Sequence, residues 1–190
     1  MHAFGLSTLL VAIAEIGDKT QLLAILLAAR FRKPWPILAG ILVATLANHA
    51  LAATAGYFVS GLLDGTWFRV LVGLGFLAMA GWALIPDKLD DDAPAPDTGR
   101  LGVFMATAVA FFLVEIGDKT QVATVALAAR FHDIAMVAAG TTLGMMLANA
   151  PAVLLGDAAV KVVPLKWVRL GAAAVFAGLG AWTLLTVALG

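Results

Sequence analysis

The sequence predicts an all-α, polytopic membrane protein with six transmembrane helices arranged as two inverted three-helix repeats. The first observation behind this fold class is composition, because 62% of the 190 residues are hydrophobic and only 13% are charged. Soluble domains average about 45–50% apolar and about 25% charged residues. The second observation is that one seven-residue segment occurs twice, one hundred residues apart. The composition excludes a water-soluble globule, and twelve basic against twelve acidic residues argue against nucleic-acid binding.

The six predicted helices are apolar stretches long enough to cross a bilayer, which takes about 20 residues per helix. They run from Phe4 to Ala29, Trp35 to Ser60, Trp67 to Ile85, Leu101 to Ala129, Ile134 to Gly156 and Trp167 to Leu189. The first stretch lacks the basic start of a secretory signal and is interrupted by charged side chains. We therefore expect it to remain part of the mature protein.

Lysines and arginines flanking the helices predict their orientation, because basic residues gather on the cytoplasmic side. Eight of them follow the first, third and fifth helices: Arg30, Arg32, Lys33, Lys88, Arg100, Lys161, Lys166 and Arg169. Only Arg69 and Arg130 are expected on the opposite side. This asymmetry predicts that both chain termini lie outside the cytoplasm.

An internal repeat defines the predicted organisation of the chain. The segment Glu-Ile-Gly-Asp-Lys-Thr-Gln at residues 15–21 recurs unchanged at residues 115–121. Because each repeat has an odd number of helices, the second must start on the opposite side of the membrane from the first. Inverted repeats of this kind are typical of secondary transporters, whose substrate sites lie near the bilayer midplane.

The repeat also divides the chain into three predicted parts. Residues 1–86 form the first three-helix repeat and residues 101–190 form the second. Residues 87–100 between them contain five aspartates and two prolines, which indicates an acidic, solvated linker on the cytoplasmic side.

The strongest functional signal is that the glutamates, glutamines and asparagines all lie inside predicted helices, in repeat-related pairs. They are Glu15 and Glu115, Gln21 and Gln121, and Asn48 and Asn149. A charged side chain at the centre of a membrane helix costs about 2.5–3.5 kcal/mol. The charged groups must therefore face one another or water, which indicates a site in the interior of the bundle.

The spacing of these residues suggests a cation site. Glu15 and Asp18 are three residues apart and are expected on one helix face, with Lys19 close enough to pair with Glu15. Gly17 permits either a close helix approach or a local break. Bringing both repeats together would collect Glu15, Asp18, Glu115 and Asp118, two charge-tuning lysines (Lys19 and Lys119), and supporting oxygens from Thr20, Thr120, Gln21, Gln121, Asn48 and Asn149.

Such an all-oxygen site with a net charge near minus two suits a hard dication such as Mn²⁺, Ca²⁺ or Mg²⁺. Carboxylates this close titrate together, so protons and a metal ion would compete for them, and competition of this kind is the basis of exchange. The chain has no cysteine, and His49 has no counterpart in the second repeat. We therefore interpret His49 as a packing or hydrogen-bonding residue rather than a ligand.

Three other interpretations remain in view. The charged residues could simply hold the bundle together, but this would leave the duplication of every glutamate and glutamine unexplained. Asp18 and Asp118 could share a proton as an intramembrane aspartyl protease does, although such a dyad needs neither the glutamates nor the lysines. An exporter of a small organic cation would instead need aromatic or apolar pocket residues between the motifs.

The two Glu-Ile-Gly-Asp-Lys-Thr copies resemble the paired Glu-x-Gly-Asp-(Lys/Arg)-(Ser/Thr) signature of a cation-exchanger family. This family includes bacterial manganese exporters and eukaryotic Golgi calcium/manganese transporters. The resemblance covers essentially the whole chain, including the acidic central linker, and neither copy departs from the motif. It implies that Glu15, Asp18, Glu115 and Asp118 bind the cation and support exchange against protons.

The resulting expectation is a secondary active transporter, not an enzyme, that exports Mn²⁺ from the cytoplasm in exchange for protons. A Ca²⁺/H⁺ antiporter of the same architecture is the alternative. The expected partners are the transported divalent cation, protons and the lipid bilayer, with no resident cofactor, and a homo-oligomer is compatible with the sequence. The likeness to bacterial exporters places the protein in the inner (plasma) membrane.

Overall fold

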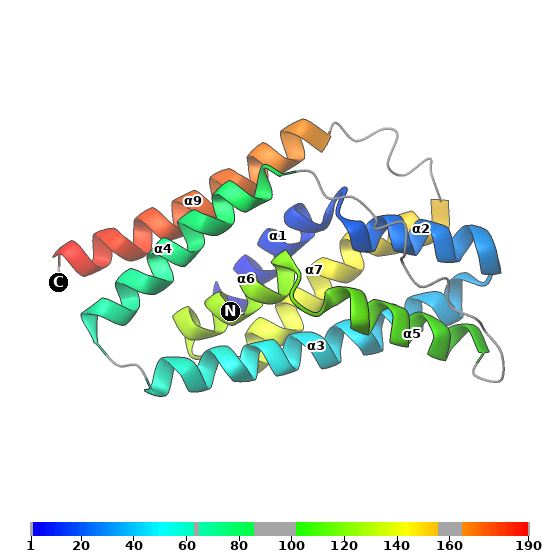
Figure 1. Ribbon diagram of the computed structural model, residues 1–190, viewed down its shortest axis with the longest axis horizontal. Helices are drawn as coiled ribbons and strands as arrows, with labels where there is room; N and C mark the ends of the chain where they lie inside the picture. Colours follow the sequence, from blue (N-terminus) through cyan, green and yellow to red (C-terminus); the bar gives the residue numbers. More distant parts are fainter. Residues whose placement is uncertain (1, 63–64, 86–101, 156–164, 190) are drawn as a thin grey trace.

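The computed structural model describes residues 2–62, 65–85, 102–155 and 165–189, and all of the regular structure within them is helical. These ranges hold the helices α1 (His2–Glu15), α2 (Lys19–Phe31), α3 (Pro34–Leu62), α4 (Thr66–Ala83), α5 (Gly102–Glu115), α6 (Lys119–Phe131), α7 (Ile134–Leu155) and α9 (Leu165–Leu189) (Figure 1). The all-α prediction is confirmed. The predicted linker over residues 87–100 lies outside the described residues.

Two of the six predicted apolar stretches are broken, and at Gly17 the structure has the local break that the sequence allowed rather than an unbroken helix. The stretch from Phe4 to Ala29 is divided into α1 and α2, and the stretch from Leu101 to Ala129 is divided into α5 and α6. At the breaks Gly17 has a φ of 81° and Gly117 a φ of 77°. Residues with a Cβ rarely adopt this left-handed conformation, which cannot continue a right-handed helix.

Four of the described helices, α3, α4, α7 and α9, are long and apolar enough to cross a membrane. The broken helices are shorter, with 14 residues in α1 and 13 in α2. At a rise of about 1.5 Å per residue, only the two halves together reach across a bilayer. The chain is a multi-pass membrane protein with four helices long enough to cross by themselves and two pairs of shorter, consecutive helices.

The two repeats run in opposite directions and interlock. In Figure 1, α1 leads to α2 from left to right, whereas α5 leads to α6 from right to left. Each first half-helix packs on the long helix of the other repeat, α1 on α7 and α5 on α3. A Cβ added at Gly140 would lie 2.5 Å from the carbonyl oxygen of Phe4, and one at Gly40 would lie 2.7 Å from that of Phe104. Glycine therefore permits both crossings.

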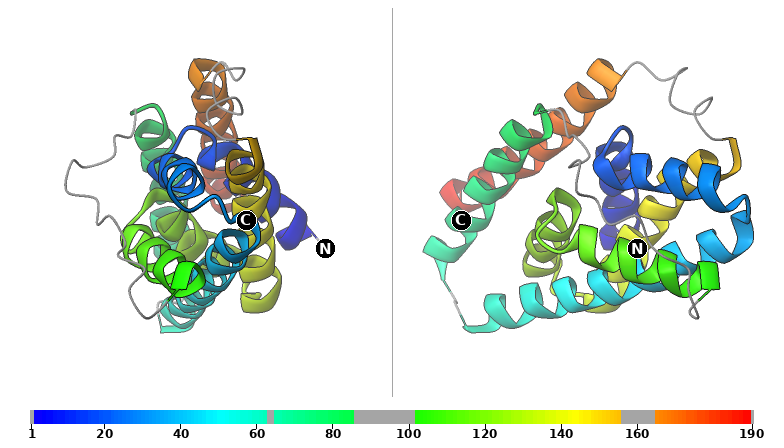
Figure 2. Two further views of the ribbon diagram at one scale, coloured as in Figure 1. Left: turned by 90° about the vertical axis from the view of Figure 1, so that its right-hand side faces the viewer. Right: turned by 45° about the vertical axis from the view of Figure 1, so that its right-hand side comes forward.

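The helices α4 and α9 form a pair that breaks the symmetry between the repeats. They pack along each other, and the pair rests on one half of the bundle, where α4 contacts α6 and α9 contacts α1. The repeat-related contacts, α4 with α5 and α9 with α2, are not among the substantial helix contacts of the described residues. Figures 1 and 2 show the pair tilted across the bundle, away from α2 and α5.

The conformation at the breaks predicts how alanine would act there. We expect Gly117→Ala to lower the free energy of unfolding by about 1–3 kcal/mol, because alanine is strained at this φ and meets no other obstacle. Gly17→Ala should cost more, since its Cβ would also lie 2.6 Å from Cδ2 of Leu165. Thermal unfolding in detergent measures both. Gly75→Ala in α4, where a Cβ meets nothing within 4 Å, is the control and should not destabilise.

Candidate metal centre

The two helix breaks bring the carboxylates of the repeated segment into the interior. Glu15 is the last residue of α1, and Asp18 is the N-cap residue of α2. The backbone N–H of Asp18 donates to the carbonyl oxygen of Glu15 at 3.0 Å, which closes the turn, and Asp118 does the same to Glu115 at 3.1 Å. The predicted shared helix face is therefore replaced by a tight turn that keeps the two acids of each motif adjacent.

The glutamines of the motif stabilise these turns. The Gln21 side-chain oxygen accepts a hydrogen bond from the backbone N–H of Gly17 at 2.8 Å, and Gln121 does the same for Gly117 at 2.7 Å. Gln21 also donates to the carbonyl oxygen of Ala148, on α7, at 2.9 Å. A break inside a membrane leaves backbone groups without helical partners, and hydrocarbon supplies none. The glutamine pair thus has a structural task at the turns.

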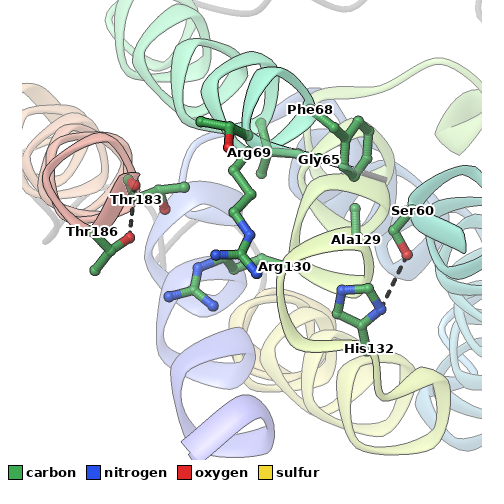
Figure 3. Close-up of a pocket in the computed structure, with 11 residues that line it drawn as sticks. Ser60, Gly65, Phe68, Arg69, Ala129, Arg130, His132, Thr183 and Thr186 are labelled. Carbon is green, nitrogen blue, oxygen red and sulfur yellow. Dashed lines mark hydrogen bonds between the residues drawn. The ribbon is translucent and has the colours of Figure 1, made fainter. Parts of the chain in front are cut away.

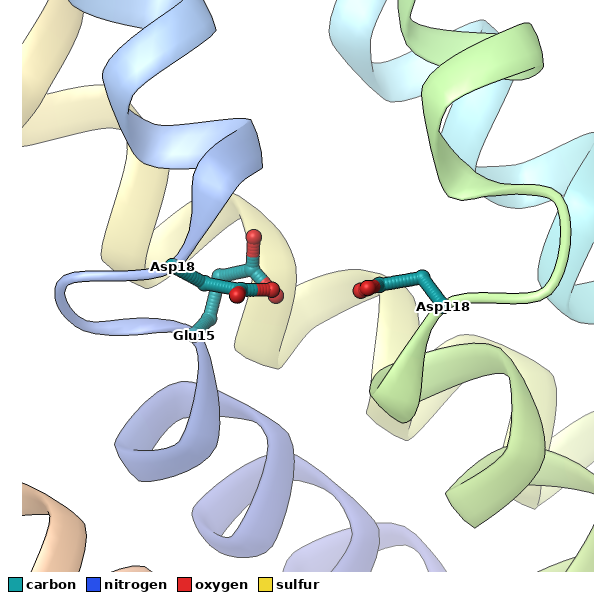
Figure 4. Close-up of side chains that lie close together, drawn as sticks. All are labelled: Glu15, Asp18 and Asp118. Carbon is teal, nitrogen blue, oxygen red and sulfur yellow. The ribbon is translucent and has the colours of Figure 1, made fainter. Parts of the chain in front are cut away.

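Three carboxylates from both repeats converge at the centre of the molecule. Glu15, Asp18 and Asp118 each offer one oxygen, and these oxygens all lie within 4.8 Å of one another. Figure 4 shows Glu15 and Asp18 at the first break pointing toward Asp118 at the second. All three residues are buried. This cluster, called here the carboxylate cluster, confirms that the two copies of the motif face each other.

The lysines of the motif make different contacts. The Lys19 ammonium lies 3.0 Å from Asp118 Oδ1, so this ion pair joins the two repeats, and the Thr120 hydroxyl donates to Asp118 Oδ2 at 3.2 Å. The Lys119 ammonium donates to the carbonyl oxygen of Ile85 at 3.0 Å. The expectation that Lys19 pairs with Glu15 assumed one continuous helix, and the break instead directs its ammonium across the interface.

The two asparagines lie on the long helices that pack against the breaks. The Asn149 amide nitrogen is 3.5 Å from Glu15 Oε1 and donates to the carbonyl oxygen of Met145 at 3.1 Å. The Asn48 oxygen accepts from the Gln121 amide at 3.4 Å. Asn149 thus borders the carboxylate cluster directly, whereas Asn48 reaches the second break through a glutamine.

Glu115, the fourth predicted ligand, stands apart from the carboxylate cluster. Its Oε2 lies 3.5 Å from Nε2 of His49, and both side chains are fully buried. His49 was predicted to be a packing or hydrogen-bonding residue because the second repeat has alanine at the equivalent position, Ala150, and its place beside Glu115 is compatible with that role. The signal in the sequence that could have placed His49 beside the predicted cation site is that it directly follows Asn48.

The electrostatics of the site favour a cation. Oε2 of Glu15, Oε1 of Glu115 and Oγ1 of Thr20 are buried and accept no hydrogen bond within the described ranges. The carboxylate cluster and Lys19 together carry a formal excess of two negative charges. The helix dipoles around the cluster act in two ways. The partly positive N-termini of α2 and α6 stabilise the carboxylates, and the partly negative C-termini of α1 and α5 favour a bound cation. A hard dication would satisfy these oxygens.

Two inverted repeats with broken helices that meet at buried carboxylates define a secondary ion transporter. The family description "Divalent cation/proton antiporter GDT1" matches residues 3–91 and 103–189, one segment in each half of the chain. The chain belongs to the GDT1 divalent cation/proton antiporter family. It is therefore a transporter and not an enzyme, which removes the aspartyl protease alternative for Asp18 and Asp118.

Several named proteins are similar to this chain. A Vibrio cholerae protein named "Putative manganese exporter" is 50% identical over 177 residues, covering 93% of this chain and 87% of that protein. The rice (Oryza sativa subsp. indica) "GDT1-like protein 4" is 29% identical, covering 82% of this chain and 63% of its own length. Arabidopsis thaliana "GDT1-like protein 5" is 25% identical, covering 98% of this chain and 96% of that protein. No solved structure is significantly similar.

The ion pair between the repeats predicts that Lys19 competes with a bound cation for Asp118. In Lys19→Met, Mn²⁺ should bind several-fold more tightly, because no ammonium has to leave the carboxylate. Isothermal titration of Mn²⁺ into purified protein measures the affinity. Lys166→Met, an exposed position at the start of α9, is the matched control and should bind as the wild type does. Weaker binding by Lys19→Met would contradict this account of the pair.

Proposed function

We propose that this protein exports Mn²⁺ from the cytoplasm in exchange for protons, and that Glu15, Asp18 and Asp118 hold the ion. The observation that carries the proposal is the carboxylate cluster, in which acids from both repeats bring oxygens within 4.8 Å of one another in the buried centre. A relative that is 50% identical and named for manganese export supports the choice of ion.

The donor set supports Mn²⁺ over Ca²⁺. Carboxylate oxygens suit both ions, but the His49 imidazole beside Glu115 adds a nitrogen donor to the edge of the site. Ca²⁺ takes oxygen ligands almost exclusively, whereas first-row transition ions accept imidazole. We therefore give Glu115 and His49 a role in receiving or releasing the ion next to the carboxylate cluster, with Thr20, Thr120 and Asn149 as supporting groups.

Exchange with protons follows from the same side chains. A metal ion binds deprotonated carboxylates, so its arrival releases protons and acid conditions weaken its binding. The Lys19 ammonium lies 3.0 Å from Asp118 Oδ1, and an arriving ion must displace it from this carboxylate. Protons and Mn²⁺ thus occupy the same oxygens in turn, which is what antiport requires.

The α4–α9 pair supports alternating access. It covers α1 and α6, which form one half of the bundle, and within the described ranges α2 and α5 have no comparable contact with the pair. The distribution of lysine and arginine assigns α2 and α5 to the cytoplasmic half, so this arrangement would be closed to the outside. Movement of the pair relative to the two repeats would then open the opposite side. We place the protein in the plasma membrane, with both termini outside the cytoplasm.

Transport by inverted membrane vesicles tests the assignment of the acids. Glu15→Gln and Glu115→Gln should each reduce Mn²⁺ uptake, driven by an acidic vesicle interior, at least about tenfold, because each loses a carboxylate that binds the ion or its exchanging protons. Asp133→Asn, which alters an acid outside the site whose oxygen accepts from the Met136 N–H, should transport normally. Wild-type rates in folded Glu15→Gln protein would refute the site.

The choice of ion is tested at His49. Replacing it by glutamine keeps a polar side chain next to Glu115 but removes the imidazole nitrogen. The ratio of Mn²⁺ to Ca²⁺ affinity, measured by competition on purified protein, should fall several-fold, mainly through weaker Mn²⁺ binding. An unchanged ratio would show that His49 does not contribute to selectivity and would favour the Ca²⁺/H⁺ alternative.

A further inference from the structure

A polar cavity lies away from the carboxylate cluster, at one end of the bundle. It has a volume of about 490 Å³ and sits where α3 and α6 end and α4 begins, with α9 alongside. Its described lining includes Arg69 from α4, Arg130 from α6 and His132 just after α6, together with the hydroxyls of Ser60 and Thr183. Figure 3 shows both arginine side chains reaching into this opening.

The cavity is positively charged. None of its described lining residues is acidic, and neither Arg69 nor Arg130 forms an ion pair with a carboxylate within the described ranges. Arg130 contacts the ring of Phe131 at 5.8 Å, which leaves the guanidinium donors available. Two guanidinium groups in one cavity repel each other, and a phosphate placed between them would receive charge-assisted hydrogen bonds from both.

An apolar groove adjoins the cavity, and Arg130 lines both. The groove has a volume of about 550 Å³ and runs between α1 and α9, bordered by Leu6, Leu9, Leu179 and Trp182. Leu179 lies about one turn from Thr183 of the cavity, further from the C-terminal end of α9. Leu9 likewise lies deeper along α1 than the chain start. The groove thus leads from the end of the bundle, where the predicted orientation places the headgroups, toward the middle of the helices.

We propose that the cavity and the groove together bind one anionic phospholipid, with its phosphate between Arg69 and Arg130 and an acyl chain along the groove. Arg130 lines both spaces, which favours a lipid over a free anion, because a soluble phosphate makes no contact with an apolar groove. On the cytoplasmic side of membranes, basic pockets between transmembrane helices bind anionic headgroups, and this cavity offers the same kind of donors on the opposite side. The bound lipid bridges α4 and α6, and so joins the α4–α9 pair to the half-helix beneath it.

Native mass spectrometry of the purified full-length chain in detergent, titrated with phosphatidylglycerol, tests this site. Arg69→Gln with Arg130→Gln should weaken phosphatidylglycerol binding at least about tenfold, because both phosphate contacts are lost. Arg30→Gln, the repeat-related position of Arg130, is the matched control and should bind as the wild type does. Arg69→Lys keeps the charge and should bind within a few-fold of wild type, which separates charge loss from misfolding.

Two further measurements distinguish the contribution of the groove to binding from that of the headgroup. A Cβ at Gly5, which lines the groove, would meet nothing within 4 Å, so Gly5→Phe can fill the groove without disturbing the helix. It should weaken phosphatidylglycerol binding but leave glycerol phosphate binding unchanged. Equal binding of phosphatidylcholine and phosphatidylglycerol would overturn the anionic assignment. Full displacement of the lipid by inorganic phosphate, with no effect of Gly5→Phe, would identify a free-anion site and overturn the lipid proposal.

Discussion

The fold depends on one constraint, which is that polar groups placed at the centre of a bilayer must find their partners inside the protein. Each helix break leaves backbone groups without their helical hydrogen-bond partners and places acidic side chains in a region that lacks water. The protein satisfies these backbone groups with its own side chains: the Gln21 side-chain oxygen, for example, accepts a hydrogen bond from the Gly17 N–H. The opposing repeat supplies the rest, through Lys19 at Asp118 and Asn149 beside Glu15. Neither repeat could bury its acids alone.

The sequence predicted most of this arrangement because duplication and hydropathy report directly on it. Four helix positions agree with the predicted spans to within about two residues, since unbroken apolar stretches have few alternatives in a membrane. The pairing of the two motifs was predictable because buried charges need partners. Their convergence in the carboxylate cluster follows from the pseudo-symmetry of an odd-numbered repeat.

The remaining features depend on contacts that a linear pattern does not contain. The sequence at Gly17 was compatible with either a close helix approach or a break. The break is seen only in the tertiary structure, where α1 packs on α7 and α2 packs on α7 and α5. The partner of Lys19 changed for the same reason, because a broken helix no longer aligns residues four apart. His49 was interpreted as a packing or hydrogen-bonding residue because it lacks a repeat counterpart, and Glu115 as its neighbour is a tertiary contact that the sequence does not reveal.

The two repeats are not identical in sequence, and this affects the relative energies of the conformations that the protein can adopt. A chain made of two identical halves could adopt two conformations of equal energy, related by the two-fold axis between the halves, and would spend equal time in each. Every difference between the halves therefore biases that equilibrium. His49 stands beside Glu115 while Ala150 occupies the related position, so one carboxylate has a neighbour that the other lacks. Unmatched side chains of this kind make the two conformations unequal in energy.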